Sequence, residues 1–393
     1  MSRASGDICD LIARSAGRCW MILTPVMPPA PGGGGVYTHT LSEALVRSKR
    51  DVVVITERYP GRGSVSCIHE TQGRRADVIR ALPWRAGRAR VDWRSYADYA
   101  LQNWRLYSIL SSSRLRAAVA RRERCVVLVH ASLIYRPNLL MPALVSLKAE
   151  CVDRVRLVAD VRDPAATLKH RTVLDQFDAV VASSWSVAAH LEALGVRAPI
   201  RHVPIPLAIP DEISKAQGAA RAERYGLTPG RYVFSPNGTS RRKGHAALRD
   251  AVIQLRRTTA PDLQLVVAGR RRDWTGEDDR ACAAGAMRFL GALPHTDVLQ
   301  LAKAAYVTAT PSPVEAPSRA ALEALAVSGP VVLPPIPEFA EIAPERVAWS
   351  MDPEGLTAAI ERASANTAPI AYDLSQHAPS KVVHRYLELE GDG

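Results

Sequence analysis

Short apolar runs alternate with amphipathic segments along most of this chain. In the first half, continuous apolar runs predict buried β-strands at 19–24, 52–56, 126–130, 155–159, 179–182 and 200–203. Between them, apolar residues recur at helical spacing, and Tyr37, Leu41, Ala44 and Leu45 share one predicted helix face. Further helices are predicted at 138–148 and after residue 182. Strands that alternate with helices predict an α/β fold with a parallel sheet covered on both faces.

The second half repeats the alternation after a proline-rich stretch at 204–229, which we interpret as a linker. Strands are predicted at 232–235, 263–268, 287–290 and 306–310. The pattern predicts two Rossmann-like domains, 1–205 and 206–375, and a helical tail at 376–393 with Val383, Tyr386 and Leu387 on one face. Two such halves predict a ligand site in the cleft between them. Residues 1–18 are interpreted as a loose leader.

One stretch, residues 311–334, carries the most chemistry: it predicts a loop, a helix and a buried strand. Pro317 suits the first turn of a helix, and Gly329 is placed for a left-handed cap. Glu315 lies in the entering loop and Glu323 lies inside the helix. The unpaired N–H groups of a helix start attract anions. These residues predict a polyhydroxylated ligand that carries phosphate.

Glycines 32–35 separate the first strand from the first amphipathic helix. They permit close approach of the backbone to a ligand, although a run of four is equally compatible with a flexible connection. His130, Arg162 and Asp163 follow predicted strands, at the edge where open α/β sheets bind ligands.

Composition limits the class of protein and the cellular compartment that can be expected. The chain has 393 residues, 47% hydrophobic and 23% charged, which is ordinary for a globular protein. The six cysteines form no C-x-x-C pair, so we expect free thiols in a reducing compartment. The N-terminus has charges where a signal peptide needs apolar residues, and no apolar run approaches the ~20 residues that span a bilayer. We therefore expect a cytoplasmic protein.

The net charge of +12 is concentrated, since residues 58–124 hold 15 arginines against 5 acids. Nucleic acid, an anionic lipid surface or an anionic substrate would suit this segment, and so would a merely solvated basic face. It contains no nucleic-acid-binding motif, so we expect no nucleic acid and at most a peripheral contact with a membrane. Tyr96, Tyr99, Tyr107, Leu106 and Leu110 can share a helical face, which is more often core than a binding surface.

Four segments in the second half resemble the retaining family 4 glycosyltransferases with the GT-B fold. They are F-S-P-N-G-T-S-R-R-K-G from 234, L-Q-L-V-V-A-G from 263, M-R-F-L-G-A-L from 287, and T-P-S-P-V-E-A-P-S-R-A-A-L-E-A-L-A-V-S-G-P-V-V-L from 310. The last is similar to that family's E-x7-E signature. Their order covers about 235–335, and the first half resembles the acceptor domain through its glycine loop and strand order. The resemblance implies two Rossmann-like domains facing across a cleft.

The resemblance also implies a role for each matching residue. Glu315 would contact the transferred sugar, and Glu323 would hold the ribose hydroxyls. Lys243 would pair with the diphosphate leaving group. The remaining donor-binding candidates are Arg241, Arg242, Asn237, Gly238, Ser318, Gly34 and Gly35. Arg162 or Asp163 would serve the acceptor, and these two residues and Glu315 are the candidate catalytic residues.

The implied reaction moves a sugar from a nucleoside diphosphate to a hydroxyl acceptor with retention of configuration. The acceptor would be a natural product, a glycan or a lipid-linked molecule. The leaving phosphate takes the acceptor proton, so the two glutamates are not the acid/base pair of a glycosidase. No cofactor and no metal are expected.

The sequence departs from the family in three places. Pro236-Asn237 stands where Gly-Arg is usual, Pro317-Ser318 where Phe-Gly is usual, and Arg162 where a His is common. Arg is not simply exchangeable with a neighbouring cation at a bidentate site. These departures leave a second hypothesis open: a catalytically inactive partner or scaffold that keeps the GT-B fold.

Overall fold

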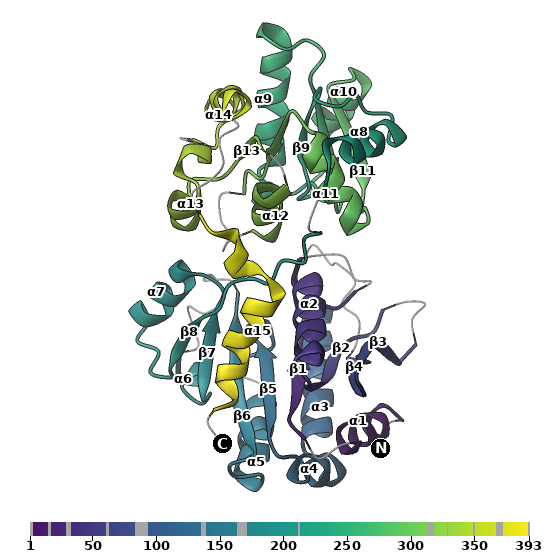
Figure 1. The fold of residues 1–393 in the computed structure, drawn as a ribbon, viewed down its shortest axis with the longest axis vertical. Coiled ribbons are helices and arrows are strands. Elements are labelled where there is room, and N and C mark those ends of the chain that lie inside the picture. The colour runs from purple at the N-terminus through teal and green to yellow at the C-terminus, as the bar shows by residue number, and fades with distance from the viewer. Residues whose placement is uncertain are drawn as a thin grey trace. The chain divides into compact units, whose positions relative to one another are not determined.

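The computed structural model divides the chain into two compact units, which we describe one at a time (Figure 1). The first unit is Met1–Pro206 together with Gln376–Gly393, and the second unit is Leu207–Ser375. The C-terminal tail is therefore part of the first unit. The structure describes residues 3–14, 17–28, 33–59, 63–82, 93–134, 139–162, 171–210, 213–312, 318–327, 329–348, 350–366 and 372–391.

The first unit is built on an eight-stranded sheet with the order β3-β4-β2-β1-β5-β6-β7-β8. Its strands are β1 (Cys19–Leu23), β2 (Asp51–Glu57), β3 (Val65–Thr71), β4 (Arg74–Leu82), β5 (Cys125–His130), β6 (Val155–Val161), β7 (Ala179–Ala182) and β8 (Ile200–His202). Only β3 and β4 pair antiparallel, and the other neighbours are parallel. The predicted parallel sheet is confirmed, and the apolar runs become its buried strands because parallel strands are covered on both faces.

Helices surround this sheet. They are α1 (Arg3–Ala13), α2 (Gly33–Arg47), α3 (Trp93–Leu110), α4 (Ser113–Ala120), α5 (Leu140–Glu150), α6 (Arg171–Leu174), α7 (Trp185–Ala193) and α15 (Pro379–Leu387). The predicted tail helix is α15, which buries Val382, Val383 and Tyr386 and packs against α2.

The prediction of a loose leader at 1–18 is wrong. Residues Arg3–Ala13 form α1, which packs against α4. Ile8, Leu11 and Ile12 are buried, at the i, i+3, i+4 spacing of one helix face. The charges among them are compatible with an amphipathic helix, which the sequence interpretation did not consider.

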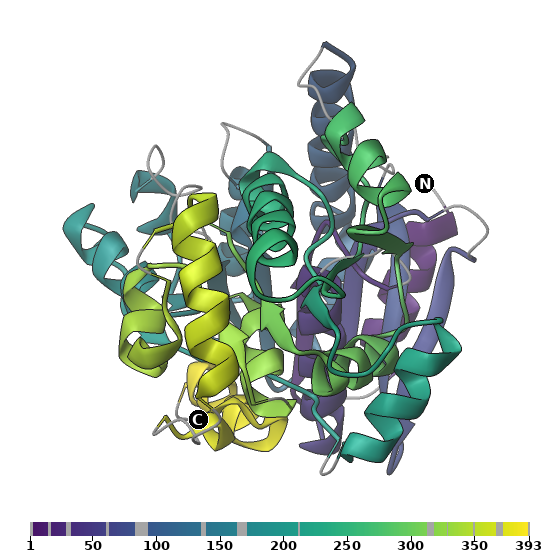
Figure 2. The ribbon, with the colours of Figure 1, turned by 90° about the horizontal axis from the view of Figure 1, so that it is seen from above.

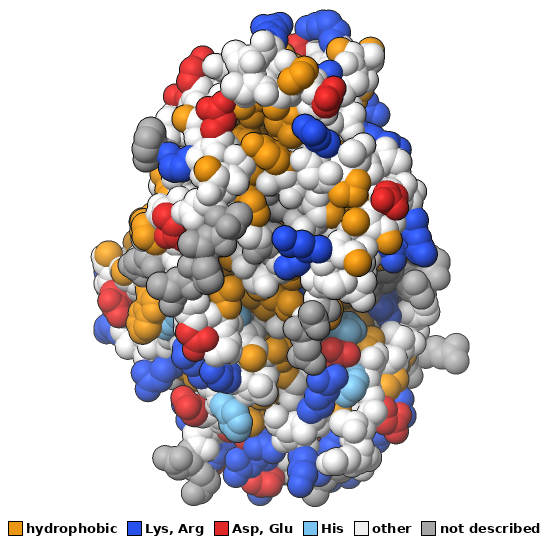
Figure 3. Space-filling view, turned by 45° about the horizontal axis from the view of Figure 1, so that its top comes forward, with side chains coloured by type: hydrophobic (Ala, Val, Ile, Leu, Met, Phe, Trp, Pro, Cys, Tyr) orange, Lys and Arg blue, Asp and Glu red, His pale blue; other side chains and the backbone are white. Residues whose placement is uncertain are grey.

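The basic segment is also more regular than its composition indicates, since it contains β3, β4, α3 and α4. On α3, Leu106 and Leu110 are buried as predicted, but Tyr107 is 38% exposed. The side chains of Tyr96 and Tyr99 lie outside the described residues. On the face drawn in Figure 3, Lys and Arg side chains are spread among acidic ones and form no single basic patch.

The second unit contains a five-stranded parallel sheet with the order β11-β10-β9-β12-β13. Its strands are β9 (Tyr232–Ser235), β10 (Gln264–Ala268), β11 (Met287–Gly291), β12 (Val307–Ala309) and β13 (Val331–Val332). Its helices are α8 (Lys215–Arg224), α9 (His245–Thr258), α10 (Gly276–Ala283), α11 (His295–Ala304), α12 (Arg319–Val327), α13 (Pro337–Ile342) and α14 (Pro353–Ala365).

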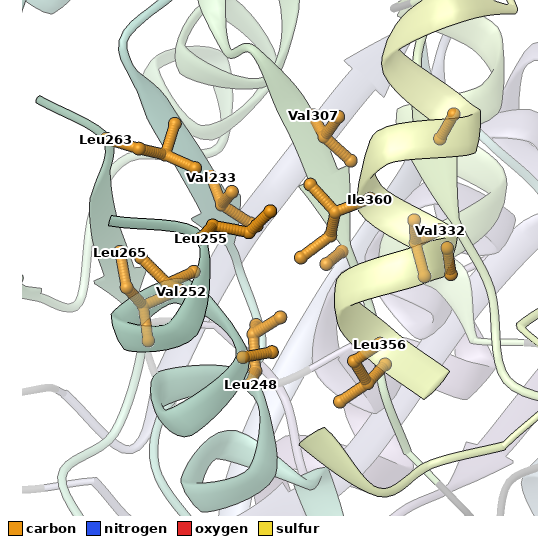
Figure 4. Close-up of a cluster of buried hydrophobic side chains, with 14 of the residues drawn as sticks. Val233, Leu248, Val252, Leu255, Leu263, Leu265, Val307, Val332, Leu356 and Ile360 are labelled. Atoms are coloured by element: carbon orange, nitrogen blue, oxygen red, sulfur yellow. The ribbon is translucent and has the colours of Figure 1, made fainter. Parts of the chain in front are cut away.

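Two apolar clusters hold the second unit together. In one, Leu248 and Val252 of α9 and Ile360 of α14 meet side chains from the strands (Figure 4). In the other, residues of α8 and α11, including Ala222 and Leu299, are buried with residues of the strands. Figure 2 gives a second view of the helices that flank the strands. Burial of these large apolar side chains is the main driving force for the unit.

All six cysteines are free thiols. Among the described residues, no helix is long and apolar enough to cross a membrane.

Candidate functional site

The loop that follows β9 is held against the loop that follows β10. Gly238 has a φ of +68°, and a Cβ built on it would lie 2.5 Å from the carbonyl oxygen of Arg270. Only glycine fits there, because both the backbone conformation and the space exclude a side chain. The Thr239 hydroxyl donates to the Arg272 carbonyl at 2.6 Å, and the Arg241 backbone N–H donates to Asp273 at 3.0 Å. The predicted donor-binding loop is therefore anchored at several points.

The same loop also meets the segment after β12. Gly244, at a φ of +68°, would place a Cβ 2.0 Å from the carbonyl oxygen of Pro311. Lys243 immediately precedes it in a short 3-10 helix, Arg241–Lys243, and is half-buried, whereas Arg241 and Arg242 are exposed. Close backbone contact thus places the segment that carries Lys243 beside the carboxyl end of β12.

Four side-chain polar atoms at this edge are buried and have no hydrogen-bond partner among the described residues. They are Ser235 Oγ, Asn237 Nδ2, Thr310 Oγ1 and Ser312 Oγ. Ser235 ends β9 and Thr310 follows β12, and these two strands are neighbours in the sheet. Buried polar atoms without partners are uncommon and destabilising. Their grouping marks the carboxyl edge of β9 and β12 as a place that suits a ligand rich in hydrogen-bonding groups.

Glu323 lies on α12 beside this edge and is 5% exposed. Arg319 Nε donates to Glu323 Oε1 at 2.5 Å, and His295 Nε2 lies 2.8 Å from the same oxygen. Burial alone would raise the pKa of Glu323, but the contacts with His295 and Arg319 outweigh it and lower the pKa. Glu323 is thus an anion at neutral pH. Arg319 and Glu323, four residues apart on α12, thus form a buried ion pair.

His295 was missed by the sequence interpretation. It is the first residue of α11 and follows β11 by a short loop, so it stands at the same carboxyl edge of the sheet as Lys243. Its position after a predicted strand was a usable signal, of the kind that drew attention to His130.

The remaining predicted residues of the second unit are only partly described. Ser318 is 7% exposed and directly precedes α12. Glu315 and Pro317 lie outside the described residues. Gly329 lies just beyond the described end of the helix, and its role as a left-handed cap stays a prediction because residue 328 is outside the described residues. The described part of the helix begins at Arg319 and ends at Val327.

A second cluster lies at the carboxyl edge of the sheet in the first unit. Of the glycines predicted as a loop, Gly33, Gly34 and Gly35 instead form the first turn of α2, and Gly32 lies outside the described residues. Gly35 is buried, and a Cβ there would lie 3.3 Å from the Val26 side chain. Close packing at this turn explains a small residue without invoking a flexible connection.

Arg162 fixes this turn. Its Nε donates to Asp160 at 2.7 Å, its Nη1 donates to the Gly34 carbonyl at 3.2 Å, and its guanidinium lies 3.5 Å from the centroid of the Tyr37 ring. The Tyr37 hydroxyl hydrogen-bonds to that of Tyr386 on α15. The predicted catalytic Arg162 is therefore engaged with the protein itself, and its geometry is that of a residue that positions α2. Asp163 lies outside the described residues.

His130 ends β5, as predicted, and its Nδ1 lies 2.8 Å from the Ser132 hydroxyl. Burial and the charge of Arg162 lower the pKa of His130 well below its usual value. It is neutral at physiological pH.

Among the described residues, no group of three or more His, Cys, Asp or Glu side chains could hold a metal ion. Positive charge near the carboxyl edge of β9 and β12 comes from Lys243 and the neighbouring Arg241 and Arg242. That the reaction needs no metal stays a prediction, because residues 313–317 are outside the described part.

Comparison with known proteins identifies the class. Residues 224–380 match the model of the group 1 glycosyl transferases, and residues 31–207 match that of glycosyltransferase family 4. The two matched segments together extend over most of both units. The chain therefore has the GT-B architecture of two parallel-sheet domains, and it belongs to the family 4 glycosyltransferases.

Solved structures agree on the fold. Sucrose-phosphate synthase from Thermosynechococcus elongatus is 16% identical with a TM-score of 0.65, and the match covers 95% of this chain and 94% of that one. The catalytic domain of starch synthase IV from Arabidopsis thaliana, bound to ADP and acarbose, is 13% identical with a TM-score of 0.66, covering 96% and 99%. A trehalose-phosphate synthase from Burkholderia xenovorans, in complex with glucose-6-phosphate, is 15% identical with a TM-score of 0.64, covering 95% and 100%. The search of curated proteins found no match.

Proposed function

We propose that this glycosyltransferase moves a sugar from a nucleoside diphosphate to a hydroxyl group of its acceptor with retention of configuration. The observation that carries the proposal is the set of unpartnered polar atoms at the ends of β9 and β12. These atoms share an edge with Lys243 and lie near the start of α12. A nucleoside diphosphate sugar has the hydroxyl and phosphate oxygens that such an edge can bind. The solved structures bound to ADP, or to a sugar phosphate, support this substrate class.

In this proposal Lys243 stabilises the diphosphate as its bond to the sugar breaks, because that is where negative charge develops. Arg241, Arg242, Asn237, Gly238 and the backbone at Ser318 complete the donor contacts. Glu323 holds the ribose through its second oxygen, since both protein contacts use Oε1. Glu315 contacts the transferred sugar.

The bond from the anomeric carbon to the phosphate oxygen breaks, and a bond from the acceptor oxygen forms on the same face. The departing phosphate oxygen takes the acceptor proton, so no protein nucleophile and no external base are needed. Gly34 and Gly35, at the start of α2, are proposed to present backbone N–H groups to the diphosphate.

A panel of nucleoside diphosphate sugars tests the donor class. The correct donor raises the unfolding temperature by mass action and is consumed with release of the nucleoside diphosphate. Lys243→Met should abolish the stabilisation and lower the release roughly 10²-fold or more. Lys215→Met is the matched control, because Lys215 is exposed on α8. A product with inverted anomeric configuration would exclude retention, and full activity of Glu315→Ala would exclude the proposed role of that carboxylate.

The hypothesis of an inactive GT-B partner rests on Asn237 and Arg162, where the family usually has other residues. It predicts binding of a donor without turnover. Release of nucleoside diphosphate by the wild-type protein, lost in Lys243→Met, would eliminate it.

A peripheral membrane contact is the proposal that best fits the exposed face of α3. Leu101, Trp104 and Tyr107 are 42%, 57% and 38% exposed at i, i+3, i+6 spacing, in an arginine-rich segment. The contact would be supported if the protein co-sediments with phosphatidylglycerol vesicles and the Trp104→Ser variant does not. Equal recovery with neutral vesicles would argue against an electrostatic component.

A further inference from the structure

Trp185 exposes 64% of its surface at the carboxyl edge of the first unit's sheet. It is the first residue of α7 and follows β7 by only two residues. The Ser184 hydroxyl accepts from the Val187 N–H at 3.1 Å, an N-cap that fixes where α7 begins. Tryptophan is usually largely buried, and an exposed one at a ligand-binding edge needs a reason.

The indole ring of Trp185 packs against the imidazole ring of His202. The two rings lie 4.2 Å apart, centroid to centroid, at an interplanar angle of 38°. His202 ends β8, which pairs with β7 so that His202 lies opposite Ala182. Burial, together with the charges of Arg385 and His377, lowers the pKa of His202 to about 4. At physiological pH the imidazole is therefore a neutral aromatic support that holds the indole without attracting anions.

Polar atoms accompany the indole at this edge. Ser183, two residues before Trp185, is 2% exposed, and its Oγ has no hydrogen-bond partner among the described residues. On the neighbouring strand β6, Asp160 is 1% exposed and its Oδ1 is likewise unpartnered. A sheet edge that carries both an exposed aromatic plane and hydrogen-bonding groups suits a ring with an apolar face and hydroxyls at its rim, which describes a pyranose.

We propose that Trp185, supported by His202, is the platform on which a pyranose ring of the acceptor stacks. The inference rests on the proposed function, since it names the acceptor of that reaction as a sugar or sugar derivative. A planar aromatic acceptor would also stack on the indole, but it offers fewer hydroxyl groups to the polar atoms of this edge. The tests below separate the two.

The first test measures binding without chemistry. Saturation-transfer NMR on the full chain, with methyl α-D-glucopyranoside and glucose 6-phosphate as probes, should detect contact to the sugar ring protons. Trp185→Ala should abolish the transfer, and Trp185→Phe should retain most of it. Val152→Ala is the matched control, because Val152 is also 64% exposed but precedes β6, at the opposite edge of the sheet. No transfer in the wild-type protein, or equal transfer in Trp185→Ala, would overturn the platform.

The second test separates the acceptor from the donor. With a donor that the wild-type enzyme turns over, Trp185→Ala should raise the KM for the pyranoside about tenfold, the effect of losing a stacked ring. The KM for the donor and the slow hydrolysis without acceptor should not change. An equal loss in donor KM would indicate general damage and overturn the assignment, and acceleration by a planar phenol but not by pyranosides would overturn the acceptor class. If no donor is turned over, the proposed function fails, and the NMR experiment alone still decides whether Trp185 binds a pyranose.

Discussion

Glu323 shows how one buried residue can belong to a structural pair and still be a candidate for ligand binding. Arg319 and His295 both contact its Oε1, so the carboxylate is fixed in orientation and charge. Such fixing prepares the second oxygen for a ligand without a further loss of side-chain freedom. A satisfied buried charge and a functional charge are therefore compatible at this position.

Replacing Glu323 by Gln should destabilise the protein, because Arg319 is only 9% exposed and would lose its counter-charge. Removing one partner of a buried pair destabilises by roughly 3–5 kcal/mol, and the amide that remains should keep the effect near or below the lower value. Urea unfolding at pH 7 measures it. The double variant Arg319→Met, Glu323→Leu should recover much of the loss, and a double variant no more stable than Glu323→Gln would contradict this account.

The Arg319–Glu323 pair also makes the free energy of unfolding depend on pH. Because the folded state lowers the pKa of Glu323, the unfolded state binds the proton first as the pH falls. The stability from Glu323 is complete above the unfolded pKa of about 4.3 and is lost as the pH falls through the folded pKa. The difference in urea midpoint between wild type and Glu323→Gln should therefore shrink in acid, and a difference that stays constant down to pH 3 would contradict the assigned shift.

The surroundings of some site residues could be predicted from the sequence, and those of others could not. The difference is how far apart the contacting residues lie along the chain. Lys243 and Glu323 stand in local motifs, so their neighbourhood was predictable. Arg162 was singled out as well, but its partners Gly34 and Tyr37 lie more than 120 residues away. Patterns of neighbouring residues carry no information on such pairings, so the sequence did not indicate that Arg162 contacts the start of α2.

Among the elements, the buried strands were the most predictable, since most of them are continuous apolar runs. Strands β3 and β4 of the basic segment were not predicted, and no residue of β3 is buried. Helix α1 was missed because its charges obscured the spacing of Ile8, Leu11 and Ile12. The turn at the start of α2 was misread for the opposite reason. Glycines are poor helix formers, yet Gly33, Gly34 and Gly35 form the first turn of α2, where Gly35 packs closely against Val26.

Two glycines with the same backbone conformation, Gly230 before β9 and Gly244 after it, allow a controlled comparison. Gly244→Ala should destabilise the second unit and strongly lower turnover, because its Cβ would lie 2.0 Å from the Pro311 carbonyl oxygen. Gly230 has a φ of +71° with no heavy atom within 4 Å of a Cβ, so Gly230→Ala should lose only the conformational term of about 1–2 kcal/mol. Thermal unfolding and nucleoside diphosphate release measure both, and equal effects would show that crowding at Pro311 is unimportant.

The start of α2 gives a prediction for Arg162. Arg162→Lys removes the planar fork that bridges Asp160 and Gly34, and also the stacking on Tyr37. Backbone amides in the first turns of α2 should exchange with solvent faster, and the donor KM should rise more than kcat falls. Arg121→Lys, at an exposed arginine that follows α4, is the control. A fall in kcat with unchanged exchange in α2 would instead favour direct catalysis by Arg162.

At the scale of the molecule, the first unit is completed by a segment that follows the second unit in sequence. The Glu390 carboxylate, which is buried, accepts from Trp20 Nε1 at 2.9 Å, from Arg18 Nη1 at 3.0 Å and from Arg50 Nε at 2.7 Å. Burial would raise its pKa, but the hydrogen bonds from Arg50, Trp20 and Arg18 outweigh this and lower it. The tail therefore packs beside β1 and the start of β2. Without it, the first unit would lack part of its apolar core.

Deleting residues 376–393 should consequently unfold the first unit and spare the second. The deletion removes the buried Val382, Val383 and Tyr386 and leaves the Trp20 indole N–H without its acceptor. Both apolar clusters of the second unit lie within 207–375, so its core stays complete. Hydrogen exchange followed for each unit should show lost protection in β1 and β5 and retained protection in β9 and β10, while deletion of Asp392 and Gly393 alone should change neither. The start of α2 also depends on Tyr386, so deletion of the tail should abolish donor turnover. A truncated protein that keeps hydrogen-exchange protection in β1 would show that the first unit is stable without its C-terminal helix.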